Sequence, residues 1–205
     1  TKSGMDDPKT VEAMEMLEGW IKDGVLPPIE TMSENGEDVL LESGKVAMVP
    51  QGSWMIAAFR DNEYTAENCD CVELPKSATT GRRASLYNGL GWAASANTEH
   101  PEEAWQLIEY LGSKEAQEKQ AELGVTMSAY TGTSEAWAKS ANFNLQAYIN
   151  MMDDMEIRPY SRSTVTWENK NSEILKSVYS GDKTMADACK EMAEQMNESL
   201  AEEQQ

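Results

Sequence analysis

The sequence has little that would support catalysis by a histidine or cysteine side chain. Histidine occurs once, as His100, and cysteine occurs at Cys69, Cys71 and Cys189. Because a Ser-His-Asp or Cys-His nucleophile needs a histidine base, and because His100 adjoins Pro101 at an expected helix start, we interpret His100 as a solvated residue. An odd number of cysteines gives no disulfide framework. We therefore expect no enzyme of the nucleophilic class.

Ligands for a metal or a nucleotide cofactor are also scarce. Cys69 and Cys71 lack two further soft ligands for a tetrahedral zinc site, and Gly89-Leu90-Gly91 lacks the third glycine of a dinucleotide fingerprint. We expect neither a metal nor a cofactor. Paired carboxylates remain open, because the 36 acidic residues include Asp153-Asp154 and Glu102-Glu103, although both pairs are better explained as solvated faces than as a glycosidase pair.

Positive charge is in short supply. The chain has 17 Lys and Arg against 36 Asp and Glu, a formal net charge of -19 and a pI near 4.3. Its only notable basic cluster is Arg82-Arg83. Nucleic-acid binding needs basic patches that neutralise phosphates, so nucleic acid is excluded as a partner. No apolar run is long enough to span a bilayer, and we expect any signal segment to lie outside this sequence.

The 205 residues, 40% of them hydrophobic, suffice for one substantial core or two modest ones. Helix caps, glycine stops and apolar stripes predict a helix-rich α/β chain. The expected helices cover residues 8–23, 37–42, 53–61, 101–111, 113–123, 134–138, 144–153, 164–179 and 184–200, and the expected strands cover 45–49, 69–74 and 92–95. Three tryptophans on helix faces, Trp20, Trp105 and Trp137, are assigned to the core, and the expected buried face of the helix at 101–111 is Ala104, Trp105, Ile108 and Leu111.

The rest of the chain is organised around residues 40–54. This stretch predicts a helix end, a left-handed glycine cap at Gly44, a short buried strand at 45–49 and a turn at Gly52. Trp54 then follows the carboxyl end of the strand, which is where ligands bind in open α/β sheets.

Several stretches, taken in order, resemble one family. These are Leu41-Glu42-Ser43-Gly44-Lys45-Val46-Ala47-Met48 with Gly52-Ser53-Trp54, then Asn88-Gly89-Leu90-Gly91-Trp92-Ala93, Pro101-Glu102-Glu103-Ala104-Trp105, Ser113-Lys114-Glu115-Ala116-Gln117 and the closing Gly181-Asp182-Lys183-Thr184-Met185. Together they resemble the carbohydrate-binding branch of the extracellular solute-binding proteins of bacterial ABC importers. Leu41 stands where the family usually has Phe, Asn88 where it often has Gly, and Met127-Ser128 where a Pro is frequent.

The resemblance implies a helix-rich lobe of the periplasmic-binding-protein-like (type II) fold around a small mixed sheet. It covers only the second half of a family member, so residues 1–205 would form the C-terminal lobe, and residues 92–127 would cross to the missing N-terminal lobe. It further implies a sugar ligand, an ABC transporter permease as partner, lobe closure as the mechanism, and a place outside the cytoplasm as a lipoprotein or periplasmic protein. No bond would be made or broken.

Aromatic residues in loops are the positive signal for a ligand. Sugars present C–H patches to a ring face and hydroxyls to polar groups at its edge. The candidate ligand-binding residues, each at a strand end, a glycine turn or a loop-helix junction, are Trp54, Trp167, Tyr87, Asn88, Trp92 and Tyr160. For the aromatic candidates the alternative role is packing in the core. For Trp167, ligand binding and core packing are equally favoured.

Two other classes of function stay open. A carbohydrate-active enzyme domain would need a carboxylate pair facing the aromatic residues. An acidic helical interaction module without a small ligand would leave those aromatic residues buried.

Overall fold

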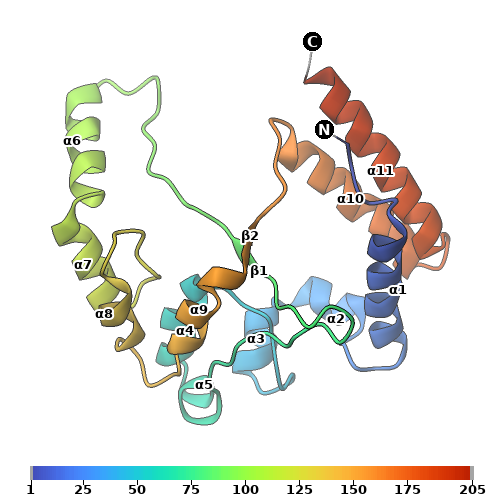
Figure 1. The fold of residues 1–205 in the computed structure, drawn as a ribbon, viewed down its shortest axis with the longest axis horizontal. Helices are drawn as coiled ribbons and strands as arrows, with labels where there is room; N and C mark the ends of the chain where they lie inside the picture. Colours follow the sequence, from blue (N-terminus) through green and yellow to red (C-terminus); the bar gives the residue numbers. More distant parts are fainter. Residues whose placement is uncertain (1, 204–205) are drawn as a thin grey trace. The chain divides into compact units, whose positions relative to one another are not determined.

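The structure is a computed structural model that describes residues 2–203. It divides into two compact units, which we treat separately (Figure 1). Unit 1 comprises residues 1–36 and 159–205, and unit 2 comprises residues 37–158. The first and the last described stretches, residues 2–36 and 159–203, therefore belong to the same unit.

Unit 1 is helical in its described part. Its helices are α1 (Pro8–Lys22), α2 (Ile29–Glu34), α10 (Thr164–Tyr179) and α11 (Met185–Glu202). The start of α1 follows from the predicted signals, because Asp7 accepts a hydrogen bond from the Lys9 amide and Pro8 occupies the first helical position. Helix α11 packs along α10 and α1 (Figure 1), and the buried cluster between them consists of Val178, Met185, Ala188, Cys189 and Met192.

The end of α11 caps the start of α10. The carboxylate of Glu203 accepts hydrogen bonds from the backbone N–H groups of Ser163, at 2.7 Å, and Arg162, at 3.2 Å, and from the Ser163 hydroxyl. First-turn N–H groups have no partner within their own helix, so this carboxylate satisfies donors that would otherwise be free. The hydrogen bond from the Ser163 hydroxyl is the main cause that lowers the pKa of Glu203 to about 2.

Unit 2 contains short elements around a small sheet. Its helical elements are α3 (Glu37–Glu42), η1 (Ser53–Met55), α4 (Ile56–Asp61), α5 (Glu63–Asn68), α6 (Pro101–Leu111), α7 (Lys114–Glu122), α8 (Ser134–Ala138), α9 (Gln146–Asn150) and η2 (Met152–Asp154). Strands β1 (Ser85–Tyr87) and β2 (Met155–Ile157) pair in parallel, with Tyr87 opposite Ile157. The expectation of a helix-rich α/β chain with a small sheet is confirmed.

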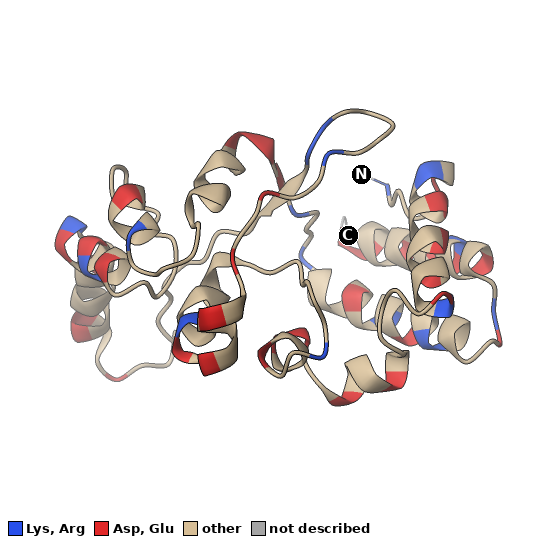
Figure 2. Cartoon of the chain, turned by 90° about the horizontal axis from the view of Figure 1, so that it is seen from below, with Lys and Arg blue, Asp and Glu red and all other residues tan. Residues whose placement is uncertain are grey.

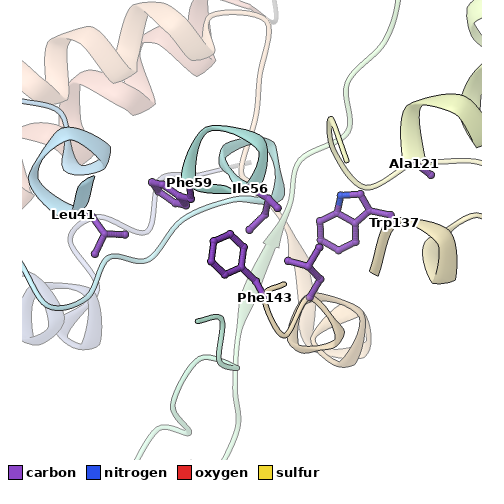
Figure 3. Packing of buried hydrophobic residues seen from close by; sticks show 7 residues of the cluster. Leu41, Ile56, Phe59, Ala121, Trp137 and Phe143 are labelled. Carbon is purple, nitrogen blue, oxygen red and sulfur yellow. The ribbon is translucent and has the colours of Figure 1, made fainter. Parts of the chain in front are cut away.

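The core of unit 2 forms between helices rather than on the sheet. Figure 3 shows Ile56 and Phe143 directed toward one another, with Phe59 to one side and Trp137 to the other. Trp137 is fully buried, and the ring of Tyr148 meets it edge-on, with centroids 5.6 Å apart and planes at 83°. The indole N–H of Trp137 has no hydrogen-bond partner among the described residues.

The three predicted strands are wrong. Residues 45–49, 69–74 and 92–95 all have irregular backbone, and no segment within residues 2–203 pairs with them as a strand. An apolar run becomes a strand only when a neighbour completes its hydrogen-bond ladder. Gly44 nonetheless adopts the predicted left-handed cap, with φ of 69° and a hydrogen bond from its N–H to the Leu41 carbonyl.

The predicted burial of α6 is also wrong. None of its side chains is buried, and Trp105 is 62% exposed. The main packing partner of the helix is α7 (Figure 1), and its large apolar side chains stay exposed. Trp20, likewise assigned to the core, is 40% exposed, whereas the assignment of Trp137 is confirmed.

Charge is carried on the solvent faces of the helices. Figure 2 shows Asp and Glu on most helices, with Lys and Arg interspersed among them. Ion pairs one helical turn apart include Lys22 with Glu18 in unit 1 and Lys114 with Glu118 in unit 2. Such exposed pairs contribute little to stability. Within residues 2–203 no helix has the length and apolar character needed to cross a membrane.

Replacing Trp137 tests the core of unit 2. Trp137→Ala should lower the free energy of unfolding by about 3–5 kcal/mol, because it removes a fully buried ring. Trp137→Phe should cost less, since it also removes an unsatisfied N–H that costs about 1–3 kcal/mol. Urea unfolding followed by circular dichroism measures both. The exposed Trp105→Ala is the matched control, and an equal loss in that variant would contradict the assigned core.

The carboxylate cap predicts a pH dependence for unit 1. Because the pKa of Glu203 is lower in the folded state, its contribution is fully present above about pH 4.5 and is lost as the pH falls toward 2. Glu203→Gln should therefore lower the melting temperature at pH 7 and have no effect near pH 2. Glu202→Gln is the control, because Glu202 is one residue away and its carboxylate has no hydrogen bond or ion pair within residues 2–203. A pH-independent difference would refute a charge-based cap.

Candidate functional site

The turn that carries Trp54 is fixed to three other parts of unit 2. The side-chain oxygen of Gln51 accepts from the Gly52 amide at 2.8 Å, and its side-chain nitrogen donates to Glu37 at 3.1 Å. The hydroxyl of Tyr148, 97 positions later, donates to the Gln51 carbonyl at 3.1 Å. These bonds hold the backbone just before Trp54, whose side chain is 53% exposed in η1.

The residue before Trp54 is anchored as well. The hydroxyl of Ser53 lies 3.0 Å from that of Thr126 in a hydrogen bond that either group can donate. Thr126 and Tyr148 could not be predicted as supports of this turn, because both lie far along the chain and neither belongs to a recognisable motif. The prediction that Trp54 is solvent-accessible is confirmed, and a cleft beside it stays a prediction.

The two groups with a raised pKa near this turn are the Cys71 thiol and the Tyr148 hydroxyl. Burial raises the pKa of Cys71 to about 11 and, with the nearby Cys71, raises that of Tyr148. A thiol with so high a pKa is a poor nucleophile at neutral pH. Among residues 2–203 no group of three or more His, Cys, Asp or Glu is arranged to hold a metal ion.

Two more candidates lie where the small sheet ends. Tyr87 is the last residue of β1 and Asn88 follows it, at the carboxyl end of a strand that runs parallel to β2. Both side chains are exposed, and Trp92, four residues further along an irregular segment, is 59% exposed. The carboxyl ends of parallel strands are the usual place for a ligand in α/β folds.

The remaining two candidates belong to unit 1 and differ in exposure. Tyr160 is 79% exposed in the loop before α10. Trp167 is only 8% exposed, and its indole N–H donates to the Ser161 hydroxyl at 3.0 Å. Burial with a satisfied N–H favours the packing alternative for Trp167.

The six candidates are thus divided between the units. Trp54, Tyr87, Asn88 and Trp92 lie in unit 2, and Tyr160 and Trp167 lie in unit 1. Among the described residues no hydrogen bond or ring contact joins one candidate to another. Within unit 2, the exposed rings of Trp54, Tyr87 and Trp92 and the amide of Asn88 offer the combination of flat apolar faces and polar edges that suits a carbohydrate.

Comparison with known families gives the class of protein. Residues 1–154 match the profile of the family described as bacterial extracellular solute-binding protein. The match covers more than half of the sequence, so the chain belongs to this family. A search of curated proteins finds no match.

A solved structure gives the fold. The chain is similar to the ABC substrate-binding protein Lmo0181 from Listeria monocytogenes, solved in complex with cycloalternan, with a TM-score of 0.82 and 17% identity. The similarity covers 98% of this chain and 52% of that one. The chain therefore has the fold of an ABC substrate-binding protein over about half the length of that relative.

Tyr148→Phe tests the support of the Trp54 turn. Deleting the hydroxyl that donates to the Gln51 carbonyl should lower the free energy of unfolding by about 1 kcal/mol, the usual net value of a hydrogen bond. Chemical denaturation measures the loss. Tyr64→Phe is the matched control, because the Tyr64 hydroxyl makes no hydrogen bond within the part of the chain that the structure describes. Equal denaturation midpoints for the two variants would show that the Tyr148 bond does not hold the turn.

Proposed function

We propose that this chain is the C-terminal lobe of a two-lobe protein that captures a carbohydrate outside the cell and delivers it to the permease of an ABC transporter. The observation that carries the proposal is the pair of coverages: nearly all of this chain matches about half of a substrate-binding protein solved with an oligosaccharide. Family membership supports an extracytoplasmic location.

The proposed ligand-binding residues are the candidates named above, taken unit by unit. In unit 2, Trp54, Tyr87 and Trp92 supply exposed rings, and Asn88 supplies an amide for hydroxyl groups. In unit 1, Tyr160 supplies an exposed ring. C–H faces of a sugar pack on such rings, while the amide selects orientation. Trp167 belongs to the set from its position in the sequence, but its burial makes it the weakest member.

Residues 92–127 are proposed to complete the first lobe. The exposure of α6 supports this, because Trp105, Leu107 and Tyr110 are 62%, 58% and 51% exposed. Exposed apolar surface of this extent on one helix is normally covered. In the proposed protein the first lobe would cover it, and closure of the two lobes around the sugar would be the binding mechanism.

We propose binding and not catalysis. Among residues 2–203, the two carboxyl groups whose pKa values are displaced, Asp61 and Glu203, are both displaced downward. A glycosidase general acid requires the opposite displacement. The acidic pairs singled out in the sequence, Glu102-Glu103 and Asp153-Asp154, lie in the first turn of α6 and in η2.

If the chain is one lobe of a two-lobe protein, it should bind the sugar only weakly by itself. A lobe that supplies one wall of the site loses the contacts of the other wall. Half of the binding free energy of a micromolar complex is about -4 kcal/mol, or a dissociation constant of about 1 mM. Calorimetry with cycloalternan, maltotriose, cellotriose and xylotriose should therefore show millimolar binding by residues 1–205 and micromolar binding by the protein with both lobes.

Two outcomes would contradict the proposal. Micromolar binding by a monomeric 1–205 chain would mean that the site is complete within it. Release of reducing sugar from any panel member would favour an enzyme. In the protein with both lobes, Trp54→Ala should weaken binding by about tenfold, whereas the control Trp20→Phe, outside the candidate set, should not.

A further inference from the structure

The indole of Trp54 lies on the main chain of Gly52. A β-carbon built on Gly52 would stand 2.1, 2.2 and 2.4 Å from Cζ3, Cη2 and Cε3 of Trp54. Carbon atoms that are not bonded do not approach so closely, since their optimal separation is about 3.5–4.0 Å. The six-membered part of the ring therefore occupies the volume that any side chain at position 52 would fill.

The backbone conformation does not explain this glycine. Gly52 has φ of -86° and ψ of 163°, which is extended geometry open to any residue. The left-handed glycines of the chain, such as Gly44 and Gly124, are required by their dihedral angles. At position 52 it is the ring of Trp54 that requires a glycine.

We infer that Gly52 is a positioning residue, which sets the Trp54 ring flat on the main chain and leaves its other face open. The inference rests on the proposed function for the identity of the ligand, a carbohydrate stacked on that open face. The ring covers Gly52 and is still 53% exposed, as expected of an aromatic group held from one side.

The support under the ring is itself held in place. The Gly52 amide donates to the side chain of Gln51, and Tyr148 donates to the carbonyl of the same residue. Ser53 is tied to Thr126. An exposed tryptophan on a mobile loop would lose rotamer freedom on binding a sugar, and a ring already seated on a fixed backbone loses less.

Tyr87 shows a looser form of the same arrangement. A β-carbon on Gly89 would lie 3.5 Å from Cε1 and 3.7 Å from the hydroxyl oxygen of Tyr87. These are ordinary contacts, so a methyl group fits there without moving the ring. Gly52 is thus the glycine on which the placement of a candidate ring depends.

The first experiment observes the ring without any ligand. In the 205-residue chain, Gly52→Ala should shift the indole N–H cross-peak of Trp54 in a ¹H–¹⁵N spectrum, with the peak assigned from its absence in Trp54→Phe. The control Gly4→Ala, where a β-carbon meets no atom within 4 Å, should leave the peak in place. An unmoved peak in Gly52→Ala would overturn the inference.

The second experiment measures affinity in the protein with both lobes, using the panel sugar bound most tightly. Gly52→Ala should weaken binding by about tenfold, as Trp54→Ala does, which corresponds to about 1.4 kcal/mol. In a Trp54→Ala background it should have no further effect, because a positioning residue acts through the ring. A further tenfold loss in that background would overturn the inference.

The two proposals fail separately. If Trp54→Ala leaves the affinity unchanged, the ligand role of Trp54 in the proposed function is wrong, and the cross-peak still decides whether Gly52 places the ring.

Discussion

The edge-on contact between Trp137 and Tyr148 joins the core of unit 2 to its candidate site. Trp137 is fully enclosed, and the Tyr148 ring is held against it while the Tyr148 hydroxyl reaches the Gln51 carbonyl. An aromatic pair of this geometry contributes about 0.5–1.5 kcal/mol beyond its burial. The position of the turn at Gly52 and Trp54 therefore depends on core packing that reaches it through one side chain, and substitutions in the core are expected to affect the site through Tyr148.

The helices of this chain were predictable because their signals are local. Three helices start at residues that cap them with a side chain, namely Asp7 (which Pro8 follows), Ser113 and Thr184. Two helices end at a glycine in the left-handed conformation, Gly44 and Gly124. The short helices α2 and α5 were missed, because six residues carry too little periodicity to stand out.

The strands were not predictable for a physical reason. Residues 45–49 and 69–74 have the composition of strands, but a strand exists only with a partner, and the partner is not encoded in the segment itself. The observed strands, β1 and β2, are three residues each and lie 70 positions apart in register. The residues of neither segment indicate that β1 pairs with β2.

The candidate site shows the same division between local and distant information. A helical stripe tells which face of α6 is apolar but not what covers it, so Trp105 was assigned to the core and is exposed. The motif around Gly52 predicted an accessible Trp54 correctly, since the turn is local. Trp167 is held by Ser161, to which its indole N–H donates, and by α11, where Gln195 donates to its carbonyl. The residues next to Trp167 in the sequence do not indicate the contact with α11.

The assembly of unit 1 from the two ends of the sequence bears on how the chain is synthesised. The Ser3 amide donates to Asn197, 194 positions away, and the apolar side of α1 packs on a cluster built from α10 and α11. At a synthesis rate of about 5–20 residues per second, α1 waits about 10–40 s for the helix that covers it. Unit 2 ends at Arg158 and is therefore synthesised before α10 and α11. The apolar side of α1 thus waits for partners that are made after all of unit 2.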